Sequence, residues 1–387
     1  MGGNLKRKKT TAADLPEELI RREILTRLPV RSLVRFKSVS KSWLSLFSEP
    51  RFIKQHFNYS TTQIPNDRLV ARRKTKVIIL SRYEEIVALD STQCVEVVGS
   101  VRGLVCLTSF NKLSLWNPAT HQSKEIFAPA RFADRKYNIG FGFDTVSDIY
   151  KLVMLSEDLR FARVYYSNSD DWINISVPHN VFTNISGTTS TNSVTIVKDC
   201  PYWTCSRYTK DYKHMNVTAL KFDAVRNEFK LMPGFFFDKV RGFEFLDMND
   251  RLTLIVYEYD KYPFTKLMLN LFSLDGEEGC CVWTKMYTIG PFSPGSEVLQ
   301  GFYSGEIVFH DHLGKFCCYN CKTDTIYKLP STSSATTDAS RLRCFRYTPS
   351  LAFIEGMKSV FGLTTRTRRA SVQYYRVPHR LINGLKH

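Results

Sequence analysis

The chain has 387 residues, of which 43% are hydrophobic and 13% aromatic. This composition supplies enough apolar surface for a packed core and excludes a wholly disordered protein. The length suits two domains, or one large domain with an appendage. No window approaches the roughly 20 consecutive apolar residues that cross a bilayer, and the polar start lacks the apolar core of a signal peptide. We therefore expect no membrane partner and a location in the nucleus, the cytoplasm or both.

The formal net charge of +17 raises the question of nucleic-acid binding. Lys6, Arg7, Lys8 and Lys9 form one basic run, and residues 366–387 carry six Lys or Arg and no acid, so most of the excess lies at two short ends. This distribution is typical of solvated tails rather than of a binding stripe with interleaved aromatics. We expect no nucleic-acid partner, and steep salt dependence of binding would reveal one. The first run is also a candidate nuclear-import signal.

Short helices are predicted in the first sixty residues. Asp14 can cap a first helix, whose apolar residues recur at helical spacing until Pro29 stops the run. Ser32 and Ser40 can cap two further helices, the last of which ends near Pro50. Three helices of this length cannot bury all their large apolar side chains. The surplus predicts an apolar patch covered by a partner or by the rest of the chain, although an ordinary helical cap on the following domain is the alternative. The residues that cannot all face inward are Leu15, Pro16, Ile24, Leu28, Pro29, Leu33 and Trp43.

Five segments of this region form one pattern, namely Leu15-Pro16, Ile24-Leu25-x-Arg27-Leu28-Pro29, Ser32-Leu33, Phe36-x-x-Val39-x-Lys41-x-Trp43 and Pro50-x-Phe52. The pattern resembles the F-box over its whole length. Ser40 is a mild departure, because family members often have Cys there. The resemblance implies docking onto a Skp-type adaptor, which in turn binds a cullin scaffold, with the seven surplus residues as the expected contacts. Aliphatic and aromatic anchors of this kind carry most of an interface's energy.

The remainder reads as short β-strands separated by turn residues, and no amphipathic helix of twelve or more residues interrupts them. A repeat is visible in which a strand ends in an aromatic residue followed by a turn. Trp116, Tyr165, Phe222, Phe272 and Tyr319 mark it, at spacings of 49, 57, 50 and 47 residues. Repeats of about 50 residues built from short strands favour kelch-like propeller blades. We expect an all-β, propeller-like domain with five marked blades and a sixth closed by residues 77–107 and 344–354; an irregular sandwich is the alternative.

Four segments carry a second resemblance: Gly103-Leu104-Val105-Cys106-Leu107, Leu115-Trp116-Asn117-Pro118-Ala119-Thr120, Gly140-Phe141-Gly142-Phe143-Asp144 with Ser147-Asp148-x-Tyr150-Lys151, and Tyr347-x-Pro349-Ser350-Leu351. They resemble the F-box-associated domain found behind many plant F-boxes. The resemblance implies a platform that recognises an unidentified target protein. The expected organisation is a basic tail (1–11), an F-box (12–58), a linker (59–76), an F-box-associated β domain (77–355) and a second basic tail (356–387).

The sequence contains no recognisable catalytic set. It has neither a Gly-rich phosphate loop nor a Gly-x-Ser-x-Gly elbow, and the glycines of Gly140-Phe-Gly-Phe-Asp are expected to permit tight packing between strands. Cys318-Tyr-Asn-Cys321 lacks a second ligand pair and His310-Asp311-His312 lacks a third ligand, so we predict no metal and no cofactor. The ten scattered cysteines are expected to be reduced thiols that fill strand positions.

Two functions from different classes follow. In the first, the chain is a non-catalytic subunit of an SCF-type ubiquitin ligase: its helices bind the adaptor, its β domain captures a target, and ubiquitination occurs elsewhere in the complex. In the second, it is a catalytic β-propeller with a fortuitous helical leader. A central site of convergent carboxylates or histidines would support the second function. We favour the first, because the surplus apolar surface calls for a partner.

Overall fold

The computed structural model describes most of the chain between Pro16 and Thr364. The described residues are 16–63, 68–73, 76–81, 84–90, 96–109, 112–129, 137–179, 181, 194–208, 214–238, 242–259, 266–276, 280–292, 297–303, 305–310, 316–320, 323, 325–328, 344–360 and 363–364. None of the helices in these ranges is long and apolar enough to cross a membrane.

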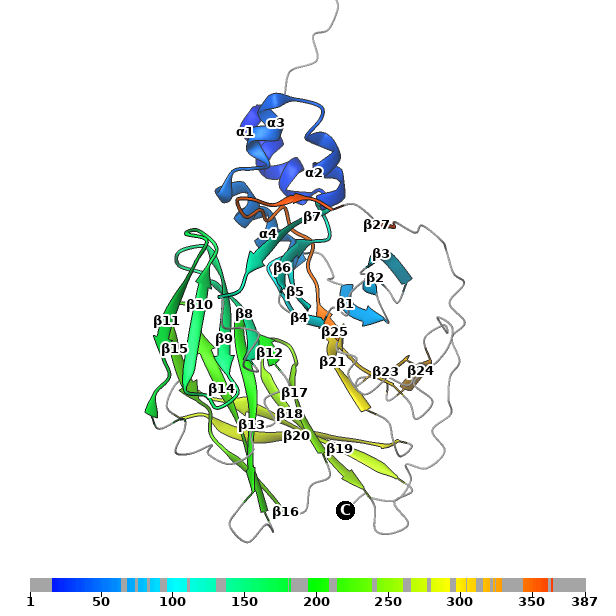
Figure 1. The fold of residues 1–387 in the computed structure, drawn as a ribbon. Coiled ribbons are helices and arrows are strands. Elements are labelled where there is room, and N and C mark those ends of the chain that lie inside the picture. The colour runs from blue at the N-terminus through cyan, green and yellow to red at the C-terminus, as the bar shows by residue number, and fades with distance from the viewer. Residues whose placement is uncertain are drawn as a thin grey trace, which may run out of the picture.

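Short helices form a bundle that stands on one end of a β-propeller (Figure 1). Ser40 caps a helix as predicted, because its Oγ accepts a hydrogen bond from the backbone N–H of Ser42 at 3.2 Å. Ser32 does not cap one; it lies inside a helix whose N-cap is Pro29. The Asp14 cap predicted from the sequence lies outside the described residues. The helices are α1 (Glu17–Leu19), η1 (Ile20–Ile24), η2 (Leu25–Arg27), α2 (Val30–Phe36), α3 (Lys41–Leu46) and α4 (Pro50–Gln63).

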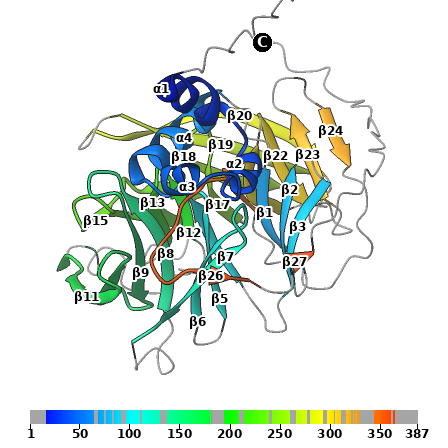
Figure 2. The ribbon, with the colours of Figure 1, turned by 90° about the horizontal axis from the view of Figure 1, so that it is seen from above.

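Within the described ranges, the strands form six antiparallel sheets, here called blades A to F. The innermost strands of neighbouring blades contact one another around a closed ring. Figure 2 shows the propeller from above, with the helices nearest the viewer. This strand order confirms the propeller and excludes the sandwich. Blade A contains β25 (Cys344–Arg346), β1 (Arg68–Arg73), β2 (Lys76–Ser81), β3 (Glu84–Asp90) and β27 (Leu363–Thr364), and blade B contains β4 (Glu96–Val101), β5 (Leu104–Ser109), β6 (Lys112–Asn117), β7 (Gln122–Phe127) and β26 (Lys358–Ser359). Blade C contains β8 (Tyr137–Asp144), β9 (Ile149–Ser156), β10 (Phe161–Tyr166) and β11 (Asp171–Ser176), and blade D contains β12 (Val194–Val197), β13 (Cys200–Tyr208), β14 (His214–Asp223), β15 (Glu228–Leu231) and β16 (Phe235–Asp238). Blade E contains β17 (Gly242–Asp247), β18 (Leu252–Tyr259), β19 (Leu267–Asp275) and β20 (Val282–Phe292), and blade F contains β21 (Glu297–Tyr303), β22 (Glu306–His310), β23 (Phe316–Asn320) and β24 (Thr325–Lys328).

The five aromatic markers of the repeat occupy equivalent places. Trp116, Tyr165, Phe222, Phe272 and Tyr319 lie on β6, β10, β14, β19 and β23, which are the third strands of blades B to F counted from the axis. In blades B and D the turn residue that follows the marker closes the next turn with its side chain: Oδ1 of Asn117 and of Asp223 each accept two backbone N–H groups from the turn. The sequence repeat therefore marks the same structural position in successive blades.

Blade A closes the ring with the end of the chain. Its innermost strand, β25, pairs with β1, so that Cys344 lies opposite Ala71. The expected sixth blade was therefore right in its use of both ends of the β domain and in β2, β3 and β25, but wrong in part of its bounds. Residues 96–107 belong to blade B, whereas β1 lies before residue 77.

The expected linker and C-terminal tail are also corrected. Helix α4 extends to Gln63, and β1 begins at Arg68, so most of residues 59–76 lies in regular structure. The basic side chains of β1 made this stretch look like a linker, but Leu69, Val70 and Ala71 between them are buried. In the range expected to be a tail, Met357 is buried, and β26 and β27 extend blades B and A at their outer edges.

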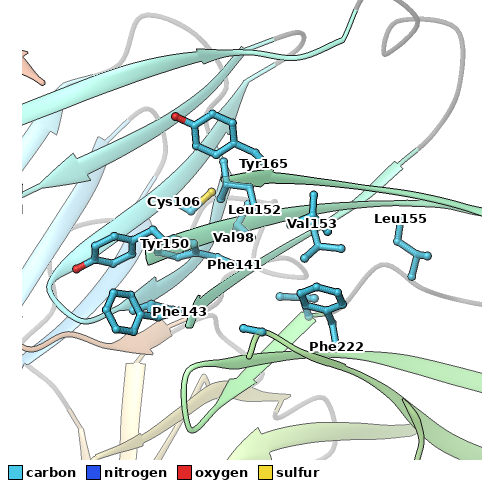
Figure 3. Packing of buried hydrophobic residues seen from close by; sticks show 14 of the residues in the cluster. Val98, Cys106, Phe141, Phe143, Tyr150, Leu152, Val153, Leu155, Tyr165 and Phe222 are labelled. Atoms are coloured by element: carbon cyan, nitrogen blue, oxygen red, sulfur yellow. The ribbon is translucent and has the colours of Figure 1, made fainter. Parts of the chain in front are cut away.

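The largest hydrophobic cluster joins blades B, C and D (Figure 3). Cys106 of blade B, Phe141 and Leu152 of blade C, and Phe222 of blade D are fully buried in it. Aromatic rings supply much of the contact; the rings of Phe141 and Tyr150, for example, stack with centroids 5.9 Å apart. Further clusters join blades D and E, E and F, F and A, and A and B, so side-chain packing connects neighbouring blades around the ring.

A buried ion pair within blade C is hydrogen-bonded to blade D. Lys151 on β9 is 1% exposed, and its Nζ donates to Oδ2 of Asp144 at 2.9 Å, to the carbonyl of Ala224 at 2.6 Å and to Oδ1 of Asn227 at 3.0 Å. Burial alone would raise the pKa of Asp144, but the backbone N–H of Ser147 and the Lys151 ammonium lower it overall. The ammonium thus has all three donors satisfied without water.

We predict that Lys151→Met lowers the free energy of unfolding by about 3–5 kcal/mol, because the Asp144 carboxylate is left buried without its cation. Urea denaturation measures the effect. The matched control is Lys112→Met, which removes an exposed pair with Glu125 at 3.5 Å and should change stability by less than about 1 kcal/mol. Equal effects of the two substitutions would contradict the importance of the buried pair.

Candidate functional site

The helical bundle has a compact aromatic core of its own. Neighbouring rings in the series Phe36, Trp43, Phe47, Phe52 and His56 lie 5.4–6.3 Å apart between centroids. Phe47 and Phe52 are completely buried, and Phe36 and Trp43 are partly buried against them. Helix α4 supplies two rings of this series, so the helix that the sequence pattern missed completes the bundle.

The seven predicted contact residues separate into different environments. Leu33 is 0% exposed and belongs to the core of the bundle, because the helical spacing of α2 turns it inward. Its role as an adaptor contact stays a prediction. Leu28 and Trp43 are partly buried, and Leu15 lies outside the described residues. Pro16, Ile24 and Pro29 are exposed.

Three further apolar side chains are exposed on the bundle. Leu19, Val39 and Leu44 are 47%, 64% and 48% exposed, compared with 42% for Ile24. None of the three was among the predicted contacts, although Leu44 follows Trp43 on a short helix and cannot share its inward face. Because these values hold in the presence of the propeller, the described part of the chain does not cover these side chains. Together with Pro16, Ile24 and Pro29, we call these residues the exposed apolar set.

His56 ties α4 to the turn before α2. It is 1% exposed, and its Nε2 lies 2.8 Å from the carbonyl oxygen of Leu28. A carbonyl can only accept, so Nε2 carries the proton and donates. Burial lowers the pKa of His56, and the hydrogen bond to Leu28 opposes part of that shift. The neutral imidazole therefore holds the Leu28–Pro29 turn, which bears two of the predicted contacts.

Acid should destabilise the bundle through His56. Its folded-state pKa is depressed, so its contribution to stability is complete above the unfolded pKa of about 6.5 and is lost as the pH falls below that value. We predict that His56→Gln, which keeps a donor near Leu28 but does not titrate, makes the free energy of unfolding less pH-dependent between about pH 7.5 and 5. His121, whose pKa is lowered by burial and by Arg31, remains in both proteins. Identical pH profiles would contradict the assignment.

Helix α4 docks on the propeller through polar contacts. Nζ of Lys54 lies 2.9 Å from both carboxylate oxygens of Asp148, in the β8–β9 turn. The guanidinium of Arg102, in the β4–β5 turn, lies over the ring of Phe57 at 5.5 Å and donates to Oδ2 of Asp199 at 2.7 Å. These contacts place the helical bundle at the end of the propeller where β4–β5, β8–β9 and β12–β13 turn.

The two ends of the propeller differ in the length of their connections. At the end that carries the helices, successive strands are joined by two to six residues. At the opposite end, the connections 128–136, 177–193 and 329–343 have nine, 17 and 15 residues. Most of these longer connections lie outside the described residues.

Five of the eight cysteines in the described part of the chain are buried. Burial raises the pKa of the Cys205 and Cys344 thiols to about 12, which disfavours the thiolate. No group of three or more His, Cys, Asp or Glu there could hold a metal ion. Of the predicted sequence motifs, Cys321, Asp311 and His312 fall outside the described residues. A Cβ at Gly140 would lie 2.5 Å from the Trp203 ring and one at Gly142 2.9 Å from the Asp199 carbonyl, which confirms the packing role of these glycines.

Two family models match the chain. The model of the F-box domain matches residues 13–55, and the model of the F-box associated beta propeller domain matches residues 40–354. The second match covers most of the chain and includes every blade.

Individual relatives agree with these models. An F-box/kelch-repeat protein of Arabidopsis thaliana is 28% identical over 57% of this chain and 65% of its own length, and an F-box protein of the same plant is 30% identical over 34% of this chain and 38% of its own length. The chain spans about a third to two thirds of the length of the curated relatives it matches. Among solved structures, the Dos1 propeller aligns with a TM-score of 0.35 at 11% identity, over 76% of this chain and 74% of that one.

Proposed function

The chain belongs to the family of F-box proteins with an F-box-associated β-propeller, and on that premise we propose that it is the substrate-recognition subunit of an SCF-type ubiquitin ligase. The F-box binds a Skp-type adaptor, which binds a cullin scaffold. The propeller binds a target protein and brings it within reach of the ubiquitin-transfer machinery. Proximity then supplies the rate advantage, and the chain itself needs no catalytic residues.

The observation that carries this proposal is the exposed apolar set. The bundle has a complete aromatic core, yet Leu19, Ile24 and Leu44 each remain more than 40% exposed beside the propeller. Exposed apolar side chains gathered on one small module are typical of a protein–protein interface. This supports burial by a partner rather than by the rest of the chain.

We further propose that the target binds at the propeller end away from the F-box. Short turns at the near end are engaged with α4, whereas the long connections 128–136, 177–193 and 329–343 lie at the far end. Loops on a rigid scaffold commonly determine binding specificity. The proposed location of the protein is the nucleus, the cytoplasm or both.

We predict that Ile24→Glu weakens binding of a Skp-type adaptor at least about tenfold without changing the melting temperature. Ile24 is exposed, so the fold tolerates the charge, but a buried interface would not. Calorimetric titration of the purified chain with the adaptor measures the affinity. Undiminished affinity would remove the support for an interface at Ile24.

Two matched variants complete this test. Leu33→Ala creates a cavity in the bundle core and should lower the free energy of unfolding by about 2–5 kcal/mol. Phe161→Glu changes a propeller residue that is 56% exposed and should leave adaptor affinity unchanged. If none of the proteins bound the adaptor and the isolated propeller showed hydrolytic turnover, the catalytic alternative would replace the proposed function.

A further inference from the structure

The four propeller segments that carry the family resemblance meet beneath the F-box. They are residues 103–107, 115–120, 140–151 and 347–351, which lie far apart in the sequence. Tyr150 Oη donates to the carbonyl of Arg102 at 3.0 Å. A Cβ at Gly103 would lie 2.2 Å from Cβ of Ser350, so only glycine permits this approach, and its φ of +86° also favours glycine. These four segments therefore build a surface that faces the F-box.

After β25 has closed the propeller, the chain continues across this surface. Residues 347–360 leave β25, pass between the helices and blade B, and end in β26 (Figure 2). We call this segment the strap. The backbone N–H of Val360 donates to the carbonyl of His121 at 2.9 Å, which fixes its far end to the β6–β7 turn.

Leu351 of the strap completes the F-box core. It is 2% exposed and belongs to the same buried cluster as Leu33, Phe47 and Phe52. Every other fully buried member of that cluster comes from the F-box helices. The next residues face differently: Ala352 and Ile354 pack into the core of blades B to D, while Phe353 is 54% exposed. The strap thus contributes to two hydrophobic cores at once.

Asn117 holds the backbone on both sides of Leu351. Its Nδ2 donates to the carbonyls of Ser350 at 3.1 Å and Ala352 at 2.8 Å. Its Oδ1 accepts the backbone N–H groups of Ala119 at 2.9 Å and Thr120 at 3.3 Å. The side chain is 0% exposed and uses both of its donors and both of its acceptor sites. Few rearrangements of the strap would keep its two bonds to Asn117, so the direction of Leu351 is fixed.

We propose that Leu351, held by Asn117, is a positioning residue that locks the F-box onto the closed propeller and makes an ordered F-box conditional on that closure. The strap begins where β25 pairs with β1, so a propeller that has not closed cannot deliver Leu351 to the F-box core. The adaptor consequently binds only chains whose target-binding propeller has closed. This last consequence rests on the proposed function, whereas the structural coupling does not.

The test compares three neighbouring alanine variants of the full chain by amide hydrogen exchange. In Leu351→Ala, we expect amides of α2 and α4 to exchange at least about tenfold faster while the blades keep their protection. In Ile354→Ala, which removes a strap side chain from the propeller core, blade B should lose protection first. In Phe353→Ala, neither region should change.

A second pair of variants keeps the test valid if Leu351→Ala is not recovered folded. Leu351→Val removes one methylene and should accelerate exchange in the same helices to a smaller extent. Asn117→Asp is isosteric but places carboxylate oxygens against the Ser350 and Ala352 carbonyls, so it should reproduce the effect from the other side of the contact. Unchanged exchange of α2 and α4 in these variants, or equal acceleration throughout the propeller, would overturn the coupling.

Titration with the adaptor separates this inference from the proposed function. If wild-type chain binds the adaptor and Leu351→Ala binds at least about tenfold more weakly, both stand. If wild type does not bind, the proposed function fails, and the exchange data alone decide the coupling. If Leu351→Ala exchanges faster but binds the adaptor as wild type does, the claim that adaptor recognition depends on closure is overturned.

Discussion

Pairing between β25 and β1 is the constraint on which the rest of the molecule depends. A propeller whose blades were all formed from consecutive strands would be held closed only by side-chain packing between its first and last blades. Here β1 pairs with β25, so that Leu69, Val70 and Ala71 lie opposite Arg346, Phe345 and Cys344. These pairs close the ring, and they also set the starting point and direction of the strap. The place of the helical module follows from that direction.

The F-box illustrates how one short sequence divides its apolar surface between folding and binding. Leu33 and Ile24 are both large aliphatic residues in the same pattern, but one is fully buried and the other is 42% exposed. Leu33 packs in one cluster with Phe52 of α4 and with Leu351, whereas Ile24 is not among the members of that cluster. The propeller segment that carries Leu351 therefore helps to determine which side chains the bundle buries.

Much of the fold could be predicted because it is local. Each third strand ends in an aromatic marker, which in several blades is followed by a residue suited to a turn. This pattern depends on contacts within one hairpin, so the repeat of Trp116, Phe222 and Tyr319 could be recognised in the sequence. The assignments that failed depend on distant partners. Strand β1 looked like a basic linker because its pairing partner lies near residue 344, and α4 was missed because Pro50, expected to end a helix, begins one.

The candidate site was predictable in the same partial way. Apolar excess indicated an interface, but spacing could not decide between Leu33 and Leu44, since each short helix has two faces and the covering elements come from elsewhere in the chain. Nor could it reveal Leu351, whose role in the F-box core requires the strap to pass over blade B. Asn117 was visible as a turn residue; its second role, as a clamp on the strap, needed the tertiary structure.

The long separation between β1 and β25 also has a consequence for the synthesis of the chain. Cys344 lies 273 positions after Ala71, its partner in the ladder. At a translation rate of ~5–20 residues per second, β1 waits roughly 14 to 55 seconds for that partner. During this time it presents an unpaired edge, which is the kind of surface that attracts strands of other chains. Its sequence, Arg-Leu-Val-Ala-Arg-Arg, places cations at both ends of the strand. Two nascent chains therefore repel one another at this edge of β1 until β25 has been synthesised and pairs with it.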